Sequence, residues 1–234
     1  MKKLFLIKAF GLLFLCFSLN TTATTIQEYT KSCPIGGETY THFYLTSYTS
    51  FGMRLDLKPI GTFFTDVEPL PVCANGFIDY QDSYTEIELT KLEELINSPE
   101  YQSLRNDNTD YFMLAKIEEH MGINKLQIAG VYLSASYEAE NNYPREKYLE
   151  YLNLTIDNLN AAIDTSDRDL GFEVNFLLIE LYRLTENFEI SKLKLNDLKA
   201  NYTAVGYEKV LIDFEEELID SQNSQPQSSP PIKS

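Results

Sequence analysis

The stretch TEIELTKLEELINSPE, Thr85–Glu100, marks the point where the chain changes from strand-like to helical patterning. Thr85 and Glu88 have the spacing of a capping box, in which each side chain bonds the other residue's backbone N–H. Apolar residues then recur at helical spacing, at Leu89, Leu92, Leu95 and Ile96. Ser98 before Pro99 is typical of the cap and first position of another helix. The stretch therefore predicts one helix after Thr85 and a second after Ser98.

The same caps and apolar stripes continue to about residue 220. Thr109–Asp110 predicts the start of a third helix, which Gly122 ends. Later stripes predict helices that begin near residues 124, 144, 174, 189 and 207. Short connections between such helices make neighbours antiparallel. The fold class expected is mostly α, with residues 85–220 forming one antiparallel helical array.

Part of this array resembles a tetratricopeptide repeat. The segments Phe176–Leu184 (FLLIELYRL) and Asn187–Ile190 (NFEI) look like the first helix and turn of such a repeat. The turns at 121–124 and 184–188 lie about 60 residues apart, which exceeds the 34-residue repeat and predicts an irregular solenoid. Solenoids present concave surfaces to protein or peptide partners.

Residues 24–84 contain five of the ten glycines and four of the nine prolines and favour a small β-rich module. In Tyr40–Tyr48 large residues alternate with period two, as in a strand. Gly61–Thr65 and Gly76–Tyr80 are shorter candidates.

The first 23 residues have the pattern of a secretory signal peptide. Lysines at 2, 3 and 8 flank the apolar run Ala9–Leu19, and cleavage is expected after Ala23. An uncleaved anchor is the alternative. The mature protein is then periplasmic or secreted, without stable membrane insertion. Removing three lysines and no acids takes the net charge from −16 to −19, which excludes nucleic acid and favours a basic partner.

Two cysteines remain after cleavage, Cys33 and Cys73, each in a C-x-x-G turn. In an oxidising compartment such a pair is expected to form a disulfide, which would staple the β-rich module. The alternative is a zinc site that adds His42 and His120 to the two cysteines. Glycine suits these turns because it adopts positive φ cheaply.

The cysteine turns also carry a resemblance to a bacterial family that joins a CPxCG-type zinc ribbon to tetratricopeptide-like helices. The residues that carry it are Cys33–Gly37, Arg54–Gly61 and Leu70–Phe77, within a likeness over about residues 30–200. Gly36 and Gly76 stand where the ribbon has its second cysteines, so the ribbon is degenerate and no metal or other cofactor is expected. The resemblance implies an architecture and no activity.

Two sets of residues are candidates for binding a protein or peptide partner. Arg54 and Asp56, with Lys58, would form a charged rim, or alternatively a simple ion pair. Six tyrosines on the predicted helices would form an exposed aromatic row, or alternatively pack between helices: Tyr132, Tyr137, Tyr148, Tyr151, Tyr182 and Tyr207. His42 is expected to be a half-exposed sheet residue.

No catalytic motif is present in the sequence, and two histidines give little material for acid–base chemistry. We therefore expect an exported, non-enzymatic binding scaffold. The alternative is a carboxylate-dependent enzyme, or a binder, acting on cell-wall fragments or carbohydrate. Residues 221–234 (SQNSQPQSSPPIKS) are expected to be disordered, so that truncation after Ser221 leaves stability unchanged.

Overall fold

The computed structural model describes residues 25–62, 67–164 and 171–231, so the expected signal peptide lies outside the described residues. The described part is mostly helical and has two small antiparallel sheets, as the sequence predicts. Its helices are α1 (Glu86–Ile96), α2 (Pro99–Leu104), α3 (Asp110–Met121), α4 (Lys125–Asn142), α5 (Arg145–Asp164), α6 (Gly171–Leu184), α7 (Phe188–Asn201) and α8 (Tyr207–Asp220). Its strands are β1 (Thr25–Ser32), β2 (Thr39–Ser47), β3 (Ser50–Met53) and β4 (Pro59–Gly61).

The helix starts follow from local capping. Both hydrogen bonds of the capping box at Thr85 and Glu88 are present. The side chains of Ser98, Thr109 and Asn124 accept hydrogen bonds from the first turns of α2, α3 and α4. The predicted starts of these four helices are therefore confirmed.

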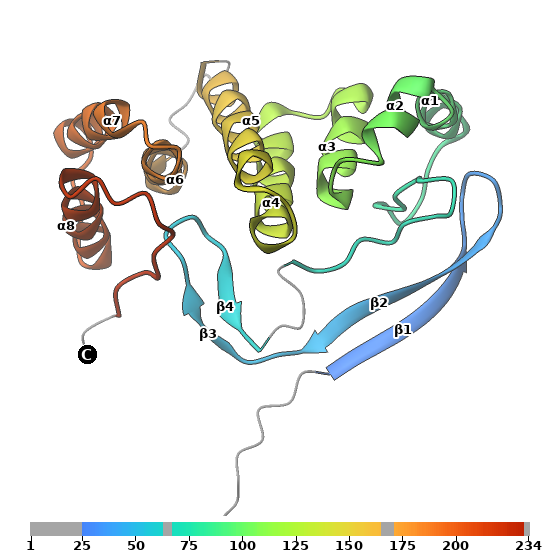
Figure 1. Ribbon diagram of the computed structural model, residues 1–234, viewed down its shortest axis with the longest axis horizontal. Helices are drawn as coiled ribbons and strands as arrows, with labels where there is room; N and C mark the ends of the chain where they lie inside the picture. Colours follow the sequence, from blue (N-terminus) through green and yellow to red (C-terminus); the bar gives the residue numbers. More distant parts are fainter. Residues whose placement is uncertain (1–24, 63–66, 165–170, 232–234) are drawn as a thin grey trace, which may run out of the picture.

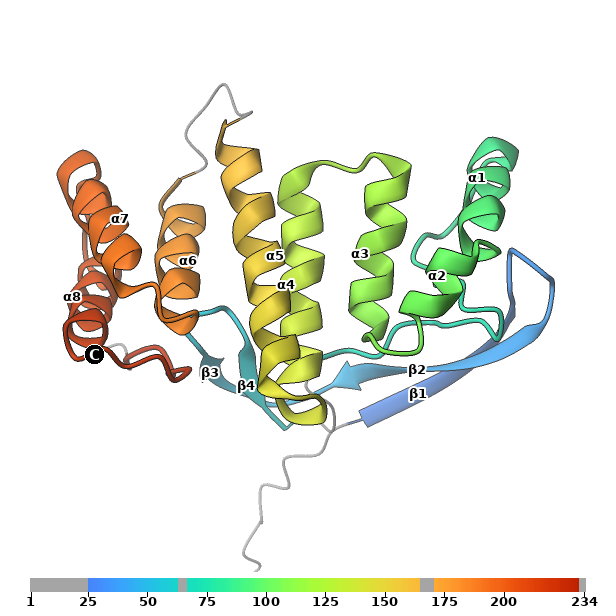
Figure 2. The same cartoon turned by 45° about the horizontal axis from the view of Figure 1, so that its top comes forward.

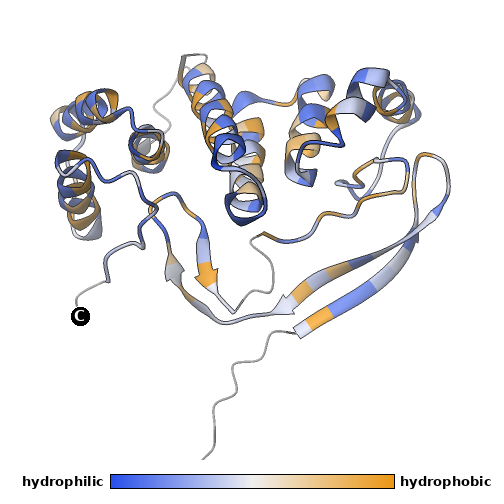
Figure 3. Cartoon of the chain, in the orientation of Figure 1, coloured by the Kyte–Doolittle hydropathy of each residue, from blue (hydrophilic) through white to orange (hydrophobic). Residues whose placement is uncertain are grey.

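The helices stand side by side in a row that runs from α1 at one end to α7 and α8 at the other (Figures 1 and 2). From α3 onward each helix packs on the next. Every helix carries both hydrophilic and hydrophobic residues, as expected for amphipathic helices in one layer (Figure 3). The β1–β2 and β3–β4 hairpins lie along one side of this row (Figure 1).

The strand region shares its core with the helices. Cys33, Ile35 and Phe77 belong to the same buried cluster as residues of α1 to α6. Leu55, beyond β3, belongs to a second cluster with Phe176 and other residues of α6, α7 and α8. The region around the disulfide therefore packs on α1 to α6, and the turn after β3 packs on α6 to α8.

Strands were predicted less well than helices. β2 matches the predicted strand, and its inward-facing Tyr40 and His42 are buried. The expectation that His42 is half-exposed is therefore wrong. Segment 76–80 forms only an isolated bridge between Val72 and Ile78. Residues 63–65 of the predicted strand 61–65 lie outside the described part. The sequence does not predict β1, because all eight of its residues are exposed. Neither face of the strand needs apolar side chains, so no alternation of apolar and polar residues results.

The predicted disulfide between Cys33 and Cys73 is confirmed. Their Cα atoms lie 5.9 Å apart, and both side chains are buried. Gly36 and Gly76 each have φ of +92°, the left-handed conformation that the turns were expected to need. The two turns are also joined by Asn75, whose side-chain amide donates to the carbonyl of Ile35 at 2.9 Å.

The expectation of a disordered tail is wrong for residues 221–231. Ser228 forms an antiparallel bridge with Arg54, and the Leu55 amide donates to the Gln227 carbonyl at 3.0 Å. The guanidinium of Arg183 donates to the carbonyls of Asn223 and Gln225. The tail is held mainly through hydrogen bonds of its backbone, which do not require apolar side chains at regular spacing. Its polar composition therefore does not predict that it is ordered.

Truncation after Ser221 should therefore lower the free energy of unfolding by about 2 kcal/mol, because it removes several tail hydrogen bonds that contribute roughly 0.5–1 kcal/mol each. Urea unfolding followed by circular dichroism would measure the change. Removing only residues 232–234 is the matched control, because it keeps all of these bonds. Equal stabilities of the two truncated proteins would contradict the docked tail.

Candidate functional site

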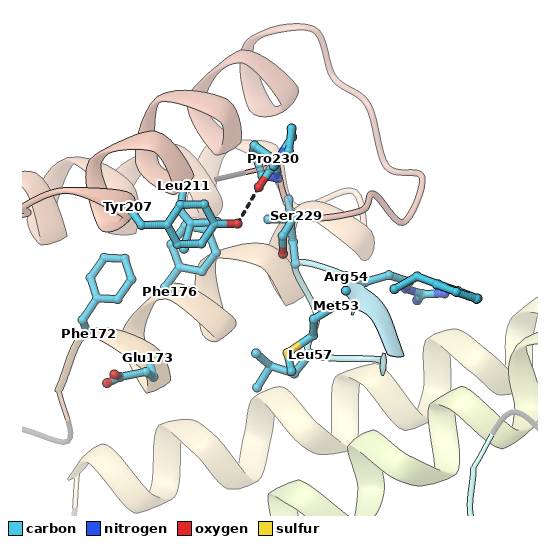
Figure 4. Close-up of a pocket in the computed structure, with 14 residues that line it drawn as sticks. Met53, Arg54, Leu57, Phe172, Glu173, Phe176, Tyr207, Leu211, Ser229 and Pro230 are labelled. Carbon is cyan, nitrogen blue, oxygen red and sulfur yellow. Dashed lines mark hydrogen bonds between the residues drawn. The ribbon is translucent and has the colours of Figure 1, made fainter. Parts of the chain in front are cut away.

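A pocket of about 570 Å³ opens between the β3–β4 hairpin, α6, α8 and the tail (Figure 4). The hairpin contributes Phe51, Met53 and Leu57. The two helices and the tail contribute Phe172, Glu173, Phe176, Tyr207, Leu211, Ser229, Pro230 and Pro231. The hairpin, α6 and the C-terminal part of the chain, which are far apart in the sequence, thus enclose one largely apolar space.

Residues 54–58 form a turn that brings an apolar side chain to this pocket. The Arg54 amide donates to the Lys58 carbonyl at 2.8 Å, and the Leu57 amide donates to the Arg54 carbonyl at 3.1 Å. Leu57 has φ of +70°, in the left-handed region that glycine favours. A leucine in this conformation costs about 1–2 kcal/mol relative to ordinary backbone.

The pocket has a buried aromatic wall and an exposed apolar rim. The rings of Phe172 and Phe176 are buried and stack with centroids 5.4 Å apart. Phe51, Met53 and Leu57 are 64%, 46% and 44% exposed. Large apolar side chains that remain exposed beside an apolar pocket are typical of a binding surface.

Polar groups of the pocket are few. The Tyr207 hydroxyl donates to the Pro230 carbonyl at 2.7 Å, which fixes the tail wall (Figure 4). Glu173 is exposed at the edge. The described lining is mostly apolar and contains neither histidine nor cysteine. Its chemistry is that of apolar binding.

The predicted charged rim is wrong, and its alternative, an ion pair, is present. Arg54 contacts the carboxylate of Asp56, and its Nη1 donates to both carboxylate oxygens of Glu140 on α4, at 2.7 and 2.8 Å. Lys58 Nζ lies 2.7 Å from the same Glu140. The Asp56 carbonyl also accepts from the Tyr137 hydroxyl. These largely buried groups fix the hairpin on α4 and are not available to a ligand.

The predicted tyrosine surface is also wrong for four of its six members. Tyr132, Tyr137, Tyr148 and Tyr151 are at most 6% exposed, so these rings pack between helices. Burial raises the pKa of each of these four phenols above the ordinary value of 10. Tyr182 is half-buried and accepts a hydrogen bond from Asn160. Only Tyr207, also half-buried, lines the pocket.

The sequence contained a signal for the missed pocket residues. Phe51, Met53, Leu55 and Leu57 alternate with period two, a pattern that predicts a strand with one apolar face. The charges at 54, 56 and 58 alternate with these residues and predict a charged rim instead. The structure buries Asp56 and Lys58, leaves Arg54 half-buried, and leaves three of the four apolar side chains exposed.

Among the described residues, no group of three or more histidine, cysteine, aspartate or glutamate side chains is placed to hold a metal ion. None of the described helices combines the length and the apolar character needed to cross a membrane. No family model matches the chain, and the searches of curated proteins and of solved structures likewise returned no match. A function therefore has to be argued from the pocket itself.

Proposed function

We propose that this is an exported, non-enzymatic protein that binds a segment of a protein or peptide partner in the pocket beside β3. In this proposal the row of helices is a tetratricopeptide-like frame that positions the hairpin and the tail. The disulfide supports export, because such bonds persist in oxidising compartments. The proposed partner is not nucleic acid, since the chain is strongly acidic.

The exposed apolar rim is the observation that carries this proposal. Burying a side chain of the size of methionine or leucine contributes about 1.5–3 kcal/mol. Folding gains only part of this free energy at three side chains that line the pocket, because they remain exposed: Phe51, Met53 and Leu57. An apolar side chain of a partner would recover it.

The backbone at Leu57 supports the same proposal. This leucine keeps a strained left-handed conformation, and its side chain remains 44% exposed. Neither property favours folding. Since glycine would close this hairpin turn at lower cost, the leucine is better explained by the apolar surface that it offers a partner.

The charge of the protein around the pocket indicates which residues flank the partner's apolar anchor. Arg54, the only cationic residue among the described residues of the lining, is already paired with Asp56 and Glu140, and its side chain points away from the pocket (Figure 4). Glu173 is therefore the available charge at the edge, within a chain of net charge −16. The partner segment we propose has an aliphatic or aromatic anchor flanked by lysine or arginine. Its binding should weaken with salt.

The enzymatic alternative has less support. A hydrolase needs a carboxylate pair that substrate can reach. Glu173 is the single carboxylate among the described residues that line the apolar pocket. Glu180 and Glu215 are joined through Arg183, which both contact. Both are fully buried, and neither lines the apolar pocket.

Peptides selected by display on the full-length mature protein should be rich in aromatic, aliphatic and basic residues. Met53→Ser and Leu57→Gly should each weaken a selected peptide about tenfold, the effect of losing roughly 1.4 kcal/mol of apolar contact. Leu57→Gly should change stability by less than about 1 kcal/mol, because relief of left-handed strain offsets glycine's larger entropy loss. Fluorescence anisotropy and urea unfolding measure the two effects.

Ile87→Ser is the matched control, because Ile87 is 71% exposed on α1 and lies outside the pocket. It should leave peptide affinity unchanged. Selected peptides that bind all three variants as tightly as the unmodified protein would overturn the proposal. So would a pocket that binds a fatty acid but none of the peptides.

A further inference from the structure

A second pocket, of about 520 Å³, lies at the other end of the molecule, between the β1–β2 hairpin and helices α3 and α4. Its lining includes His42 from β2, Glu68, Asp79, and Glu118 near the end of α3. It shares no residue with the apolar pocket. A ligand here would therefore be bound independently of the proposed partner segment.

Glu118 is the unusual group of this second pocket. Its side chain is buried, with the residue only 3% exposed. The side-chain amide of Gln127 donates to its Oε1 at 2.9 Å, whereas Oε2 has no hydrogen-bond partner. Burial raises the pKa of this carboxyl above 4.5. A buried carboxylate with one unpartnered oxygen and no ion pair is costly, and a cation would relieve that cost.

The described groups around Glu118 do not supply that cation. Asp79 is a second buried carboxylate, and its Oδ2 accepts from the Tyr40 hydroxyl at 2.6 Å and lies 2.7 Å from Lys31 Nζ. Its Oδ1 has no partner. Burial lowers the pKa of His42 below 6.5, which keeps its ring neutral at pH 7. Glu68 adds an exposed carboxylate, so three acids face one lysine.

The remaining walls suit a short hydrocarbon stem. Leu114 and Ile123 contribute aliphatic surface from α3 and the turn after it, and Tyr80 and Tyr111 contribute aromatic rings. Aromatic faces attract cations as well as apolar groups. The described residues hold no cluster suited to a metal ion. An organic cation therefore fits these walls better than a bare ion.

We propose that this second pocket binds a primary ammonium group on a short alkyl stem, with Glu118 as its main carboxylate. The ammonium would give Oε2 the hydrogen bond that it lacks, and Asp79 and Glu68 would add negative potential. The stem would lie along Leu114 and Ile123. The group could belong to a free alkyl amine or to a lysine side chain, which present the same chemistry.

Titration calorimetry of the full-length mature protein with n-butylammonium, and with Nα-acetyl-lysine amide as the lysine form, tests the inference. Butylammonium should bind at least about tenfold more tightly than 1-butanol, its neutral isostere. Binding of the amine alone would identify a free amine as the ligand class, and binding of the lysine form would identify a protein side chain.

Glu118→Gln should weaken the binding of either amine by about tenfold or more without lowering the unfolding midpoint, because it removes a buried charge and keeps the shape. Glu94→Gln, an exposed carboxylate on α1, is the control and should bind like the unmodified protein. Equal binding of amine and alcohol, or undiminished binding by Glu118→Gln, would overturn the inference. Met53→Ser should not affect amine binding. A failure of the amine-binding inference can therefore be told apart from a failure of the proposed peptide site.

Discussion

Replacing Arg183 with methionine should lower the free energy of unfolding at pH 7 by about 3–5 kcal/mol, the usual cost of leaving buried charge without its partner. Arg183 is fully buried on α6. Its guanidinium contacts the buried carboxylates of Glu180 and Glu215 and donates to two carbonyls of the tail. Methionine would fill similar space but would leave two acids and two carbonyls without their cation.

The loss should depend on pH in a defined direction. Burial, together with the neighbouring Glu215, raises the pKa of Glu180 well above 4.5, and burial raises that of Glu215. The folded protein therefore holds more protons than the unfolded chain between pH 4.5 and the raised values. Stability from these groups is greatest below pH 4.5 and is lost as pH rises through the raised values. Without Arg183 the values should rise further, so the variant's deficit should be smaller at pH 5 than at pH 7.

Arg145→Met is the matched control for this prediction. Arg145 pairs with Glu186 at 3.2 Å, and both side chains are largely exposed. Removing such a pair costs about 0–1 kcal/mol. Urea unfolding of both variants at pH 5 and pH 7 gives the comparison. If Arg183→Met and Arg145→Met were equally stable, the buried network would contribute no more than a surface pair.

Helices were predictable here because their determinants are local. A cap such as Thr109 and a stop such as Gly122 act through hydrogen bonds and φ angles within a few residues. The apolar stripes needed only to face a neighbouring helix, whichever helix that was. Helix starts could therefore be predicted without knowing the tertiary arrangement.

The contacts between Arg183 and the tail could not be predicted from such local patterns. A single arginine among glutamates in an amphipathic helix is usually a solvated group. Its burial depends on α8, which brings Glu215 to it, and on carbonyls of a segment with no apolar pattern. No short-range rule connects these positions, which are 32 and 42 residues away along the chain.

The candidate sites were missed for a related reason. Tyrosines on amphipathic helices indicate a candidate binding surface, but α4 and α5 pack face to face and bury Tyr137 and Tyr148. The exposed groups are instead Phe51, Met53 and Leu57, which a sequence pattern would assign to a core. Whether an apolar face is covered depends on what packs against it, and one sequence does not contain that information.

Strand β2 and the β3–β4 hairpin, which contribute residues to the two pockets, lie inside the loop closed by the disulfide, so their order should depend on it. Cys33 and Cys73 are separated by 40 residues, and this segment contains β2, β3 and β4, including Phe51–Leu57 and His42. In the chain-entropy account, closing a loop of that length restricts the unfolded chain and stabilises the protein by roughly 4 kcal/mol. Helices α3 to α8 lie outside the loop and pack mainly on one another.

The double variant Cys33→Ala/Cys73→Ala should therefore lose about 4 kcal/mol of unfolding free energy. Amide exchange should become faster in residues 39–61 before it does in α4 and α5, because the loop loses its closure while the helical row keeps its core. Urea unfolding and mass-resolved hydrogen exchange measure both effects. Reductant should reproduce them in the unmodified protein, adding the mass of two hydrogen atoms, and should not alter the double variant. If exchange accelerated uniformly instead, hairpins and helices would unfold as one unit, and neither pocket could be lost without the whole fold.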